Sequence, residues 1–406
     1  MIRIRLLTVL TLLLVLGGSA LAGRAQSAGQ IAIAAQDGNI YLYDLAADLT
    51  VPLTQDAVAN RKVYTWPTWS NDGRLAFFGT STLPGDRYQL GIFLQRALGE
   101  TERLYTSRNE TFTYANWAPA DCPAGNCRDL AVLYTTARGS LALRRLRVDG
   151  TVSITELSEG GPHYWDWSPD GAAMFWVRYG SELAIFDSTS GAIAETFDDR
   201  PGFQRAVDWS PVDDRLLAAI HQPGRGNSLA IFDGAERVVL ADHLRGAVSF
   251  EWSPDGRRVA FLDEQRAALM VVDARSGAPV ATAPDDVYAF FWAPDSARLA
   301  YVTLPTPGQQ VLTRQRGAPR LQWVVFEPDT GIISRLASFV PNLEMIYYLR
   351  FFDQFARSHR LWSPDSRYLT YAELLDDGRS VVSLVDTTSA GTARTLMDGR
   401  IGVFSW

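Results

Sequence analysis

The chain has 406 residues, of which 47% are hydrophobic, 11% aromatic and 20% charged, and its formal net charge is −7. This composition supports a large folded core and excludes a disordered chain. The acidic balance, with scattered Arg and a single Lys (Lys62), offers no obvious electrostatic route to nucleic acid or anionic lipid and disfavours nucleic-acid binding.

Residues 1–22 are predicted to be a signal peptide. Arg3 and Arg5 precede an apolar run over residues 6–16, and Ala20-Leu-Ala22 fits a small-x-small cleavage site. We therefore expect export to the periplasm or the extracellular space, a short linker over 23–29, and no membrane span in the mature chain. The alternative is an uncleaved N-terminal helix that anchors the protein, for which the apolar run is short.

The only two cysteines, Cys122 and Cys127, enclose the four residues Pro-Ala-Gly-Asn. In an oxidising compartment this spacing predicts a local disulfide. A metal site would need two further ligands, and no His lies nearby in the sequence. We expect no metal and no cofactor.

A tryptophan-containing turn recurs along the chain. Trp-Ser-Pro-Asp-Gly begins at Trp167 and again at Trp252, and imperfect copies follow other Trp residues at spacings of 40 to 50 residues, with one spacing of 70. Such a period is typical of one propeller blade. Ser, Pro, Asp and Gly occupy the favoured positions of a type I turn. The eight Trp residues of the repeat are Trp69, Trp117, Trp167, Trp209, Trp252, Trp292, Trp362 and Trp406.

The residues around each turn predict four short antiparallel strands per unit. The C-terminal run 402–406 is a first strand without a continuation, whereas the run 30–35 is a second strand without a first. Together they complete one blade and close a ring. The prediction is an all-β, eight-bladed β-propeller over 30–406, closed by the C-terminal strand joining the N-terminal strands, with seven blades as the alternative.

On these turns and strands the chain resembles the TolB-like propeller repeats, a WD-like class named for its Trp-Ser-Pro-Asp-Gly turn, over residues 30–406. The resemblance implies a propeller. It also implies an exported protein similar to a periplasmic Tol component that binds other envelope proteins. Similar propellers precede the hydrolase domain of prolyl-oligopeptidase-like peptidases. The chain departs from both patterns, because it predicts eight blades rather than six, shows no separate small N-terminal domain and ends at the last propeller strand.

No local catalytic motif is present: Gly-x-Ser-x-Gly, His-Glu-x-x-His and Gly-x-x-x-x-Gly-Lys are all missing, and the four His fall in different units. The repeated Asp of the turn is interpreted as a cap of its own turn rather than as a cation ligand. We therefore predict no catalytic residues and no enzyme. A site assembled across blades stays open as the weaker hypothesis.

Three acids precede the Trp in consecutive units, and they are the main candidates for a binding site. If the Trp-bearing strand is innermost, Asp166, Asp208 and Glu251 lie along one arc near the central channel, where they could recognise a polar or cationic group. The competing interpretation is hydrogen bonding or ion pairing between blades. The residues His163, Arg205 and His359 precede the same kind of strand and are expected near the channel mouth.

The 70-residue unit contains an insertion over about 339–360. At 100° per residue, Met345, Leu349, Phe352 and Phe355 share one side, so a short amphipathic helix is expected. Three interpretations stay open: a lid, a plug in a wide channel, or a docking patch. Its aromatic anchors for docking would be Tyr347, Phe351 and Phe352.

These observations predict an exported, monomeric, non-catalytic binding module that mediates protein–protein interaction in the cell envelope. Its partner is expected to be an envelope protein or a small ligand, and not nucleic acid. The alternative is a sensor of a small molecule or glycan at the channel mouth. The least favoured alternative is a hydrolase or lyase with a cross-blade active site.

Overall fold

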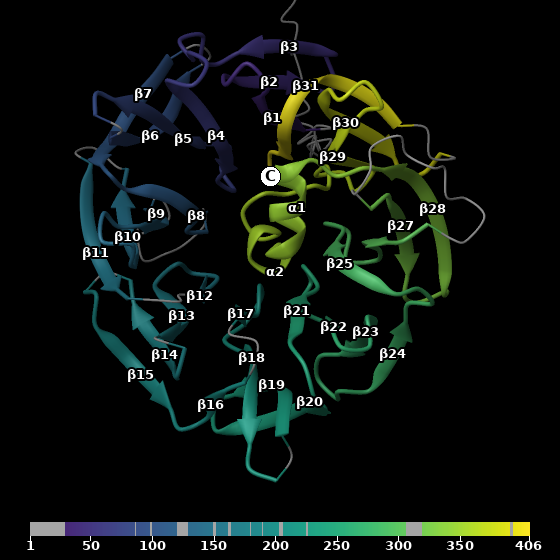
Figure 1. Cartoon of the computed structure of the whole chain (residues 1–406). Helices are drawn as coiled ribbons and strands as arrows, with labels where there is room; N and C mark the ends of the chain where they lie inside the picture. Colours follow the sequence, from purple (N-terminus) through teal and green to yellow (C-terminus); the bar gives the residue numbers. More distant parts are fainter. Residues whose placement is uncertain are drawn as a thin grey trace, which may run out of the picture.

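The computed structural model describes residues 29–85, 87–97, 100–119, 129–148, 152–160, 164–178, 180–188, 190–202, 206–224, 226–305, 319–389 and 393–406. These residues form an all-β ring of antiparallel sheets around a central axis, with two short helices in the middle of the ring (Figure 1). The propeller fold predicted from the repeat is confirmed. The sequence predictions for residues 1–28, and for Cys122 and Cys127, lie outside the described residues.

The described strands form seven sheets. Four-stranded sheets are β4 (Lys62–Trp69), β5 (Leu75–Leu83), β6 (Arg87–Ala97) and β7 (Glu100–Arg108); β8 (Thr111–Trp117), β9 (Asp129–Thr135), β10 (Leu141–Arg147) and β11 (Ser153–Glu159); β12 (Tyr164–Trp167), β13 (Ala173–Arg178), β14 (Glu182–Asp187) and β15 (Ile193–Phe197); β21 (Val248–Trp252), β22 (Arg258–Asp263), β23 (Ala268–Asp273) and β24 (Pro279–Thr282); and β25 (Val287–Trp292), β26 (Leu299–Thr303), β27 (Leu321–Glu327) and β28 (Ile332–Phe339).

The two remaining sheets are larger. One has five strands, β16 (Arg200–Pro201), β17 (Val207–Trp209), β18 (Leu216–Gln222), β19 (Gly226–Asp233) and β20 (Glu236–Leu244). The other has six, in the order β29 (Tyr368–Leu374), β30 (Ser380–Asp386), β31 (Ala393–Phe404), β1 (Gln30–Ala35), β2 (Ile40–Asp44) and β3 (Leu49–Pro52).

The prediction of eight separate blades is not matched, and the alternative of seven is. The reason is the length of β31, which has 12 residues. Its first half pairs with β30 and its second half pairs with β1, so two units of the repeat merge into one continuous sheet. Counting Trp residues detects repeat units, but it does not detect a strand that runs through two of them.

The chain ends meet in this six-stranded sheet. Ile31 lies opposite Phe404 and Ile33 lies opposite Gly402 in the antiparallel register of β1 and β31. The side chains of Ile31, Ile33 and Phe404 are fully buried. The pairing of the C-terminal strand with the first N-terminal strand therefore agrees with the closure predicted from the sequence.

The repeated turn has the hydrogen bonds that its residue types predict. At Ser253, the hydroxyl accepts the backbone N–H of Arg258 at 3.0 Å and bonds the carboxylate of Asp255 at 2.7 Å. Gly256 closes the turn with φ of +67°, a conformation that costs glycine little. Where Ser366 replaces this glycine at φ of +58°, its hydroxyl accepts the backbone N–H of Asp295 from the preceding unit at 2.9 Å.

The Trp residues connect consecutive units. The indole N–H of Trp117 donates to the carbonyl of Thr68 at 3.0 Å, that of Trp292 to Glu251 at 3.3 Å, and that of Trp362 to Phe291 at 3.2 Å. In each case the acceptor is the residue just before the Trp of the previous unit. These bonds join three pairs of neighbouring inner strands, whereas the indole N–H groups of Trp167, Trp209 and Trp252 have no hydrogen-bond partner among the described residues.

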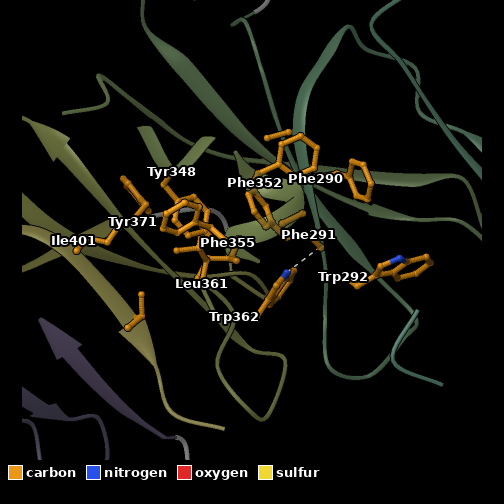
Figure 2. Close-up of a cluster of buried hydrophobic side chains, with 14 of the residues drawn as sticks. Phe290, Phe291, Trp292, Tyr348, Phe352, Phe355, Leu361, Trp362, Tyr371 and Ile401 are labelled. Atoms are coloured by element: carbon orange, nitrogen blue, oxygen red, sulfur yellow. Dashed lines mark hydrogen bonds between the residues drawn. The ribbon is translucent and has the colours of Figure 1, made fainter. Parts of the chain in front are cut away.

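The 339–360 segment fills the centre of the ring. It forms α1 (Leu343–Arg350), capped by the side chain of Asn342, and the single turn α2 (Phe352–Phe355). Both lie inside the ring of sheets in Figure 1. Met345, Phe352 and Phe355 are at most 4% exposed, as their shared side predicts. Figure 2 shows Tyr348, Phe352 and Phe355 packed among Phe290, Phe291 and Trp362, so the segment acts as a plug.

Substituting Gly402 by Ala should weaken the closure of the ring. A Cβ at Gly402 would lie 2.7 Å from a methyl carbon of Val382 and 3.2 Å from one of Ile31. Such overpacking costs about 1–3 kcal/mol, and the midpoint of urea denaturation should fall accordingly. Thr395→Ala, an exposed change on the same strand, is the control and should shift stability by no more than about 0.5 kcal/mol. Equal midpoints for the two variants would contradict a tightly packed closure.

Candidate functional site

The residues before three consecutive Trp residues point to one central cavity. Asp166 on β12, Asp208 on β17 and Glu251 on β21 all line a cavity of about 480 Å³. Side chains alternate along a strand, so the residue before each Trp faces differently from the Trp itself. The structure therefore brings together the three acids that the sequence singled out.

Arg357, which follows α2, lies between the first two acids. Its guanidinium is 3.7 Å from the carboxylate of Asp166 and 3.6 Å from that of Asp208, and its side chain is 10% exposed. It also donates a hydrogen bond to the carbonyl of Val207. The plug thus contributes a cation to the acidic arc.

The same two acids also link the units. Asp166 accepts the backbone N–H of Trp209 at 2.8 Å, and Asp208 accepts that of Trp252 at 3.0 Å. Hydrogen bonding between blades, the competing interpretation of the acidic arc, therefore exists for these two acids, and a backbone hydrogen bond from Trp292 adds Glu251 as the third. These bonds hold the carboxylates in place without removing them from the cavity wall.

Burial changes the protonation of the acids. It raises the pKa of Glu251 to about 7, against the opposing charges of Arg357 and Arg360. It also raises the pKa of Asp208 well above its ordinary value, against Arg357. A carboxyl group with a pKa near 7 can both take up and release a proton at neutral pH, as a general acid–base catalyst must.

A second guanidinium, that of Arg360, completes the cavity. It lies over the ring of Trp406. Burial lowers the pKa of Arg360 to about 9, although the charge of Glu251 opposes the fall. The rest of the wall consists mainly of Trp and Pro side chains from successive turns, among them Trp167, Trp209, Pro211, Trp252, Pro254 and Trp292.

His359 does not lie at the channel mouth, and that prediction is wrong. Its side chain is fully buried and is not part of the cavity wall. The ring nitrogens are 3.1 Å from the hydroxyl of Thr68 and 2.6 Å from that of Ser358. Burial lowers the pKa of His359 to about 3, so it is a neutral core residue. His163 and Arg205 lie outside the described residues.

The aromatic residues proposed as docking anchors lie in different environments. Phe352 is 4% exposed, with ring centroids 5.2 Å from Phe290, so it cannot be a surface anchor. Tyr347 is 38% exposed and packs 5.8 Å from Trp66. Phe351 is half-buried against Tyr347. A continuous docking patch formed by all three is therefore excluded.

Sequence reasoning missed the two cations of the cavity, Arg357 and Arg360. Both belong to the run Arg357-Ser-His-Arg360, which directly follows the aromatic helix and precedes Trp362. A basic pair at the end of a buried aromatic segment was the available signal. No signal in the sequence showed that this run would lie opposite β12, β17 and β21, because that position depends on the order of the blades around the axis.

Among the described residues, no three His, Cys, Asp or Glu side chains are grouped so that they could hold a metal ion. Neither of the two described helices has the length and apolar character needed to cross a membrane.

No protein family and no curated protein matches the sequence. Among solved structures, the chain is similar to the dihydro-heme d1 dehydrogenase NirN in complex with DHE, with 15% identity, a TM-score of 0.54, and coverage of 94% of this chain and 76% of that one. It is also similar to an oligogalacturonate lyase from Vibrio parahaemolyticus, with 14% identity, a TM-score of 0.49, and coverage of 83% and 86%. At such identities the likeness shows the β-propeller fold.

The similarity to NirN corrects the prediction of a non-catalytic module for protein–protein interaction. NirN has the same fold and is a dehydrogenase. The propeller fold is therefore compatible with catalysis, and missing local motifs do not exclude it. The prediction that the protein is not an enzyme is therefore wrong.

Replacing Glu251 by Gln should change how stability depends on pH. The ordinary pKa of the carboxyl is 4.5 and its pKa in the folded chain is about 7. Between these values the folded chain holds a proton that the unfolded chain has released, so the stability of the wild type falls as pH rises and then levels off above about pH 7.

Glu251→Gln should lack this loss. At pH 8 it should be more stable than the wild type by about 2 kcal/mol, since one pKa unit corresponds to about 1.4 kcal/mol and solvent in the cavity screens part of the charge. At pH 4 the difference should vanish. Urea denaturation between pH 4 and pH 8 measures both differences in stability. Glu264→Gln, an exposed carboxyl of the same unit, is the control, and identical pH profiles for the two variants would contradict the buried-acid assignment.

Proposed function

We propose that the central cavity is an active site in which Glu251 moves a proton to or from a small polar molecule. The observation that carries the proposal is the pKa of this carboxyl, about 7, on the wall of a cavity of about 480 Å³. This volume is within the range of small-molecule sites. A carboxyl that titrates near neutrality in a cleft is a strong candidate for acid–base catalysis.

The neighbouring groups support this assignment. Asp166 and Asp208 are held by backbone N–H groups, and Arg357 lies between them, so the charges next to Glu251 are pre-oriented. Preorganised charges stabilise a transition state more effectively than groups that must reorient. The reaction class that fits is a lyase or a hydrolase, because both need a group that takes or gives a proton.

Three further expectations from the sequence are part of the proposal. Export through residues 1–22 would place the protein in the periplasm or outside the cell. Membership in the TolB-like class is supported by the Trp-Ser-Pro-Asp-Gly turns. A sensor of a small molecule or glycan would use the same cavity but would leave the bound molecule unchanged.

The test is turnover of small polyols and sugar acids followed by proton NMR in D₂O. The wild-type protein is incubated with hexoses, hexuronates and their disaccharides. Loss of C–H signals reports proton exchange or elimination, and a shift of the anomeric signals reports hydrolysis. Glu251→Gln should reduce the rate of any such reaction by about 10²–10⁴-fold. If Glu251 acts as the base, the rate should rise with pH and level off above about pH 7.

Glu264→Gln is the matched control and should react at the wild-type rate. Reaction of Glu251→Gln at the wild-type rate would refute its catalytic role. Binding of a probe without any consumption by the wild type would favour the sensor over the enzyme.

A further inference from the structure

Arg360, one of the two cations of the cavity, differs from the other arginines that stack on the repeated Trp residues. Arg74 lies over Trp117 at 4.8 Å, and Arg215 lies over Trp252 at 4.9 Å. Each of them also pairs with an Asp of its own turn, Asp72 and Asp213 respectively, at 2.8 and 2.9 Å. Stacking on Trp combined with a carboxylate partner is therefore the pattern of the repeat.

Arg360 keeps the stacking and lacks the carboxylate. Its guanidinium lies over Trp406, yet within the described residues its side chain forms neither an ion pair nor a hydrogen bond. Its place is the cavity wall rather than the outer end of a turn. Because a guanidinium presents several donors in one plane, a cation with one face on an aromatic ring still offers its edge to an anion.

The cost of this arrangement points to a missing partner. Burial of a charge without a hydrogen-bonded counter-ion is unfavourable, and the charge of Glu251 in the same cavity offsets only part of this effect, so the pKa of Arg360 stays lowered. Arg357 in the same cavity is balanced by Asp166 and Asp208, so it is not equally available. Among the cavity cations, Arg360 is the one free to bind an anionic group.

The remaining wall limits what that anion can be. Three acids, Asp166, Asp208 and Glu251, line the same cavity and would repel a doubly charged phosphate. The same carboxyl groups accept hydrogen bonds from hydroxyls. The Trp and Pro side chains around them offer apolar faces to C–H groups.

We propose that Arg360 binds the carboxylate of a hydroxylated monocarboxylic acid, of the sugar-acid class, whose hydroxyls face the acidic arc. This inference rests on the proposed function in that it places the substrate of the same cavity next to Glu251. It concerns equilibrium binding, however, and stands or falls separately from turnover.

The test compares matched probes by isothermal titration calorimetry. Glucuronate, its uncharged methyl ester, glucose and inorganic phosphate are titrated into the wild type, Arg360→Gln, Arg360→Lys and Arg257→Gln. Arg257 is the control, because its side chain is 84% exposed and its loss removes the same charge. We expect glucuronate to bind the wild type at least tenfold more tightly than glucose, the methyl ester or phosphate.

Arg360→Gln should weaken glucuronate binding at least tenfold and remove the preference over glucose. Arg360→Lys should retain part of the glucuronate affinity. Arg257→Gln should leave that affinity unchanged. Equal binding of glucuronate and glucose, tighter binding of phosphate, no binding of glucuronate, or an unaffected Arg360→Gln would each overturn the proposal. The wild-type comparison of glucuronate with its ester decides the question even if a variant fails to fold.

Glu251→Gln separates this proposal from the proposed function. It should retain or strengthen glucuronate binding, because it removes a negative charge from the cavity. Arg360-dependent binding together with unchanged turnover in Glu251→Gln would refute the catalytic role of Glu251 and leave the anion site standing.

Discussion

The hydrogen bond that the backbone N–H of a Trp donates to the acid just before the previous Trp is the interaction on which the site depends. It joins Trp209 to Asp166 and Trp252 to Asp208, which are 43 and 44 residues apart in the chain. Since a carboxylate accepts several hydrogen bonds, each acid is held by the next unit and still lines the cavity. The bond that joins these units thereby also fixes the residue before the Trp at the axis. In three consecutive units that position is acidic.

The central plug turns this ring of positions into a site. A ring of this size leaves a space at the axis that the inner strands alone do not fill. α1 and α2 occupy part of it with Met345, Tyr348, Phe352 and Phe355, and the segment that leaves α2 brings in two guanidinium groups. What remains is a cavity with acids on the strand side and cations on the plug side. Burial in this cavity raises the pKa of Glu251, whereas the two guanidinium groups of the plug segment oppose the rise.

Much of the fold and part of the candidate site could be predicted from the sequence. The features that could not be predicted escaped for physical reasons. The turn chemistry and the 40-to-50-residue period determine local strands, which is why the propeller, the closure by β1 and β31, and the axial placement of Asp166, Asp208 and Glu251 could be predicted. The blade count could not, because β31 runs through two units without a break in its pattern. The prediction for His359 was wrong because adjacent residues in the segment after α2 face opposite directions. Arg360 therefore lines the cavity, whereas His359 is buried. The prediction of a non-catalytic module failed because it was inferred from missing compact motifs, and a site assembled from separate blades would leave no such motif.

The sharing of one sheet by both ends of the chain has a consequence for how the protein folds. The contacts between Ile31 and Phe404 connect residues that are separated by nearly the whole described chain. Pairings of such long range are slow to form, because the entropy of closing the loop is lost before the contacts compensate for it. During synthesis β1 emerges early and has a free edge until β31 becomes available. Until then that edge is exposed to pairing with other chains, so slow docking of β31 favours misassembly over ring closure.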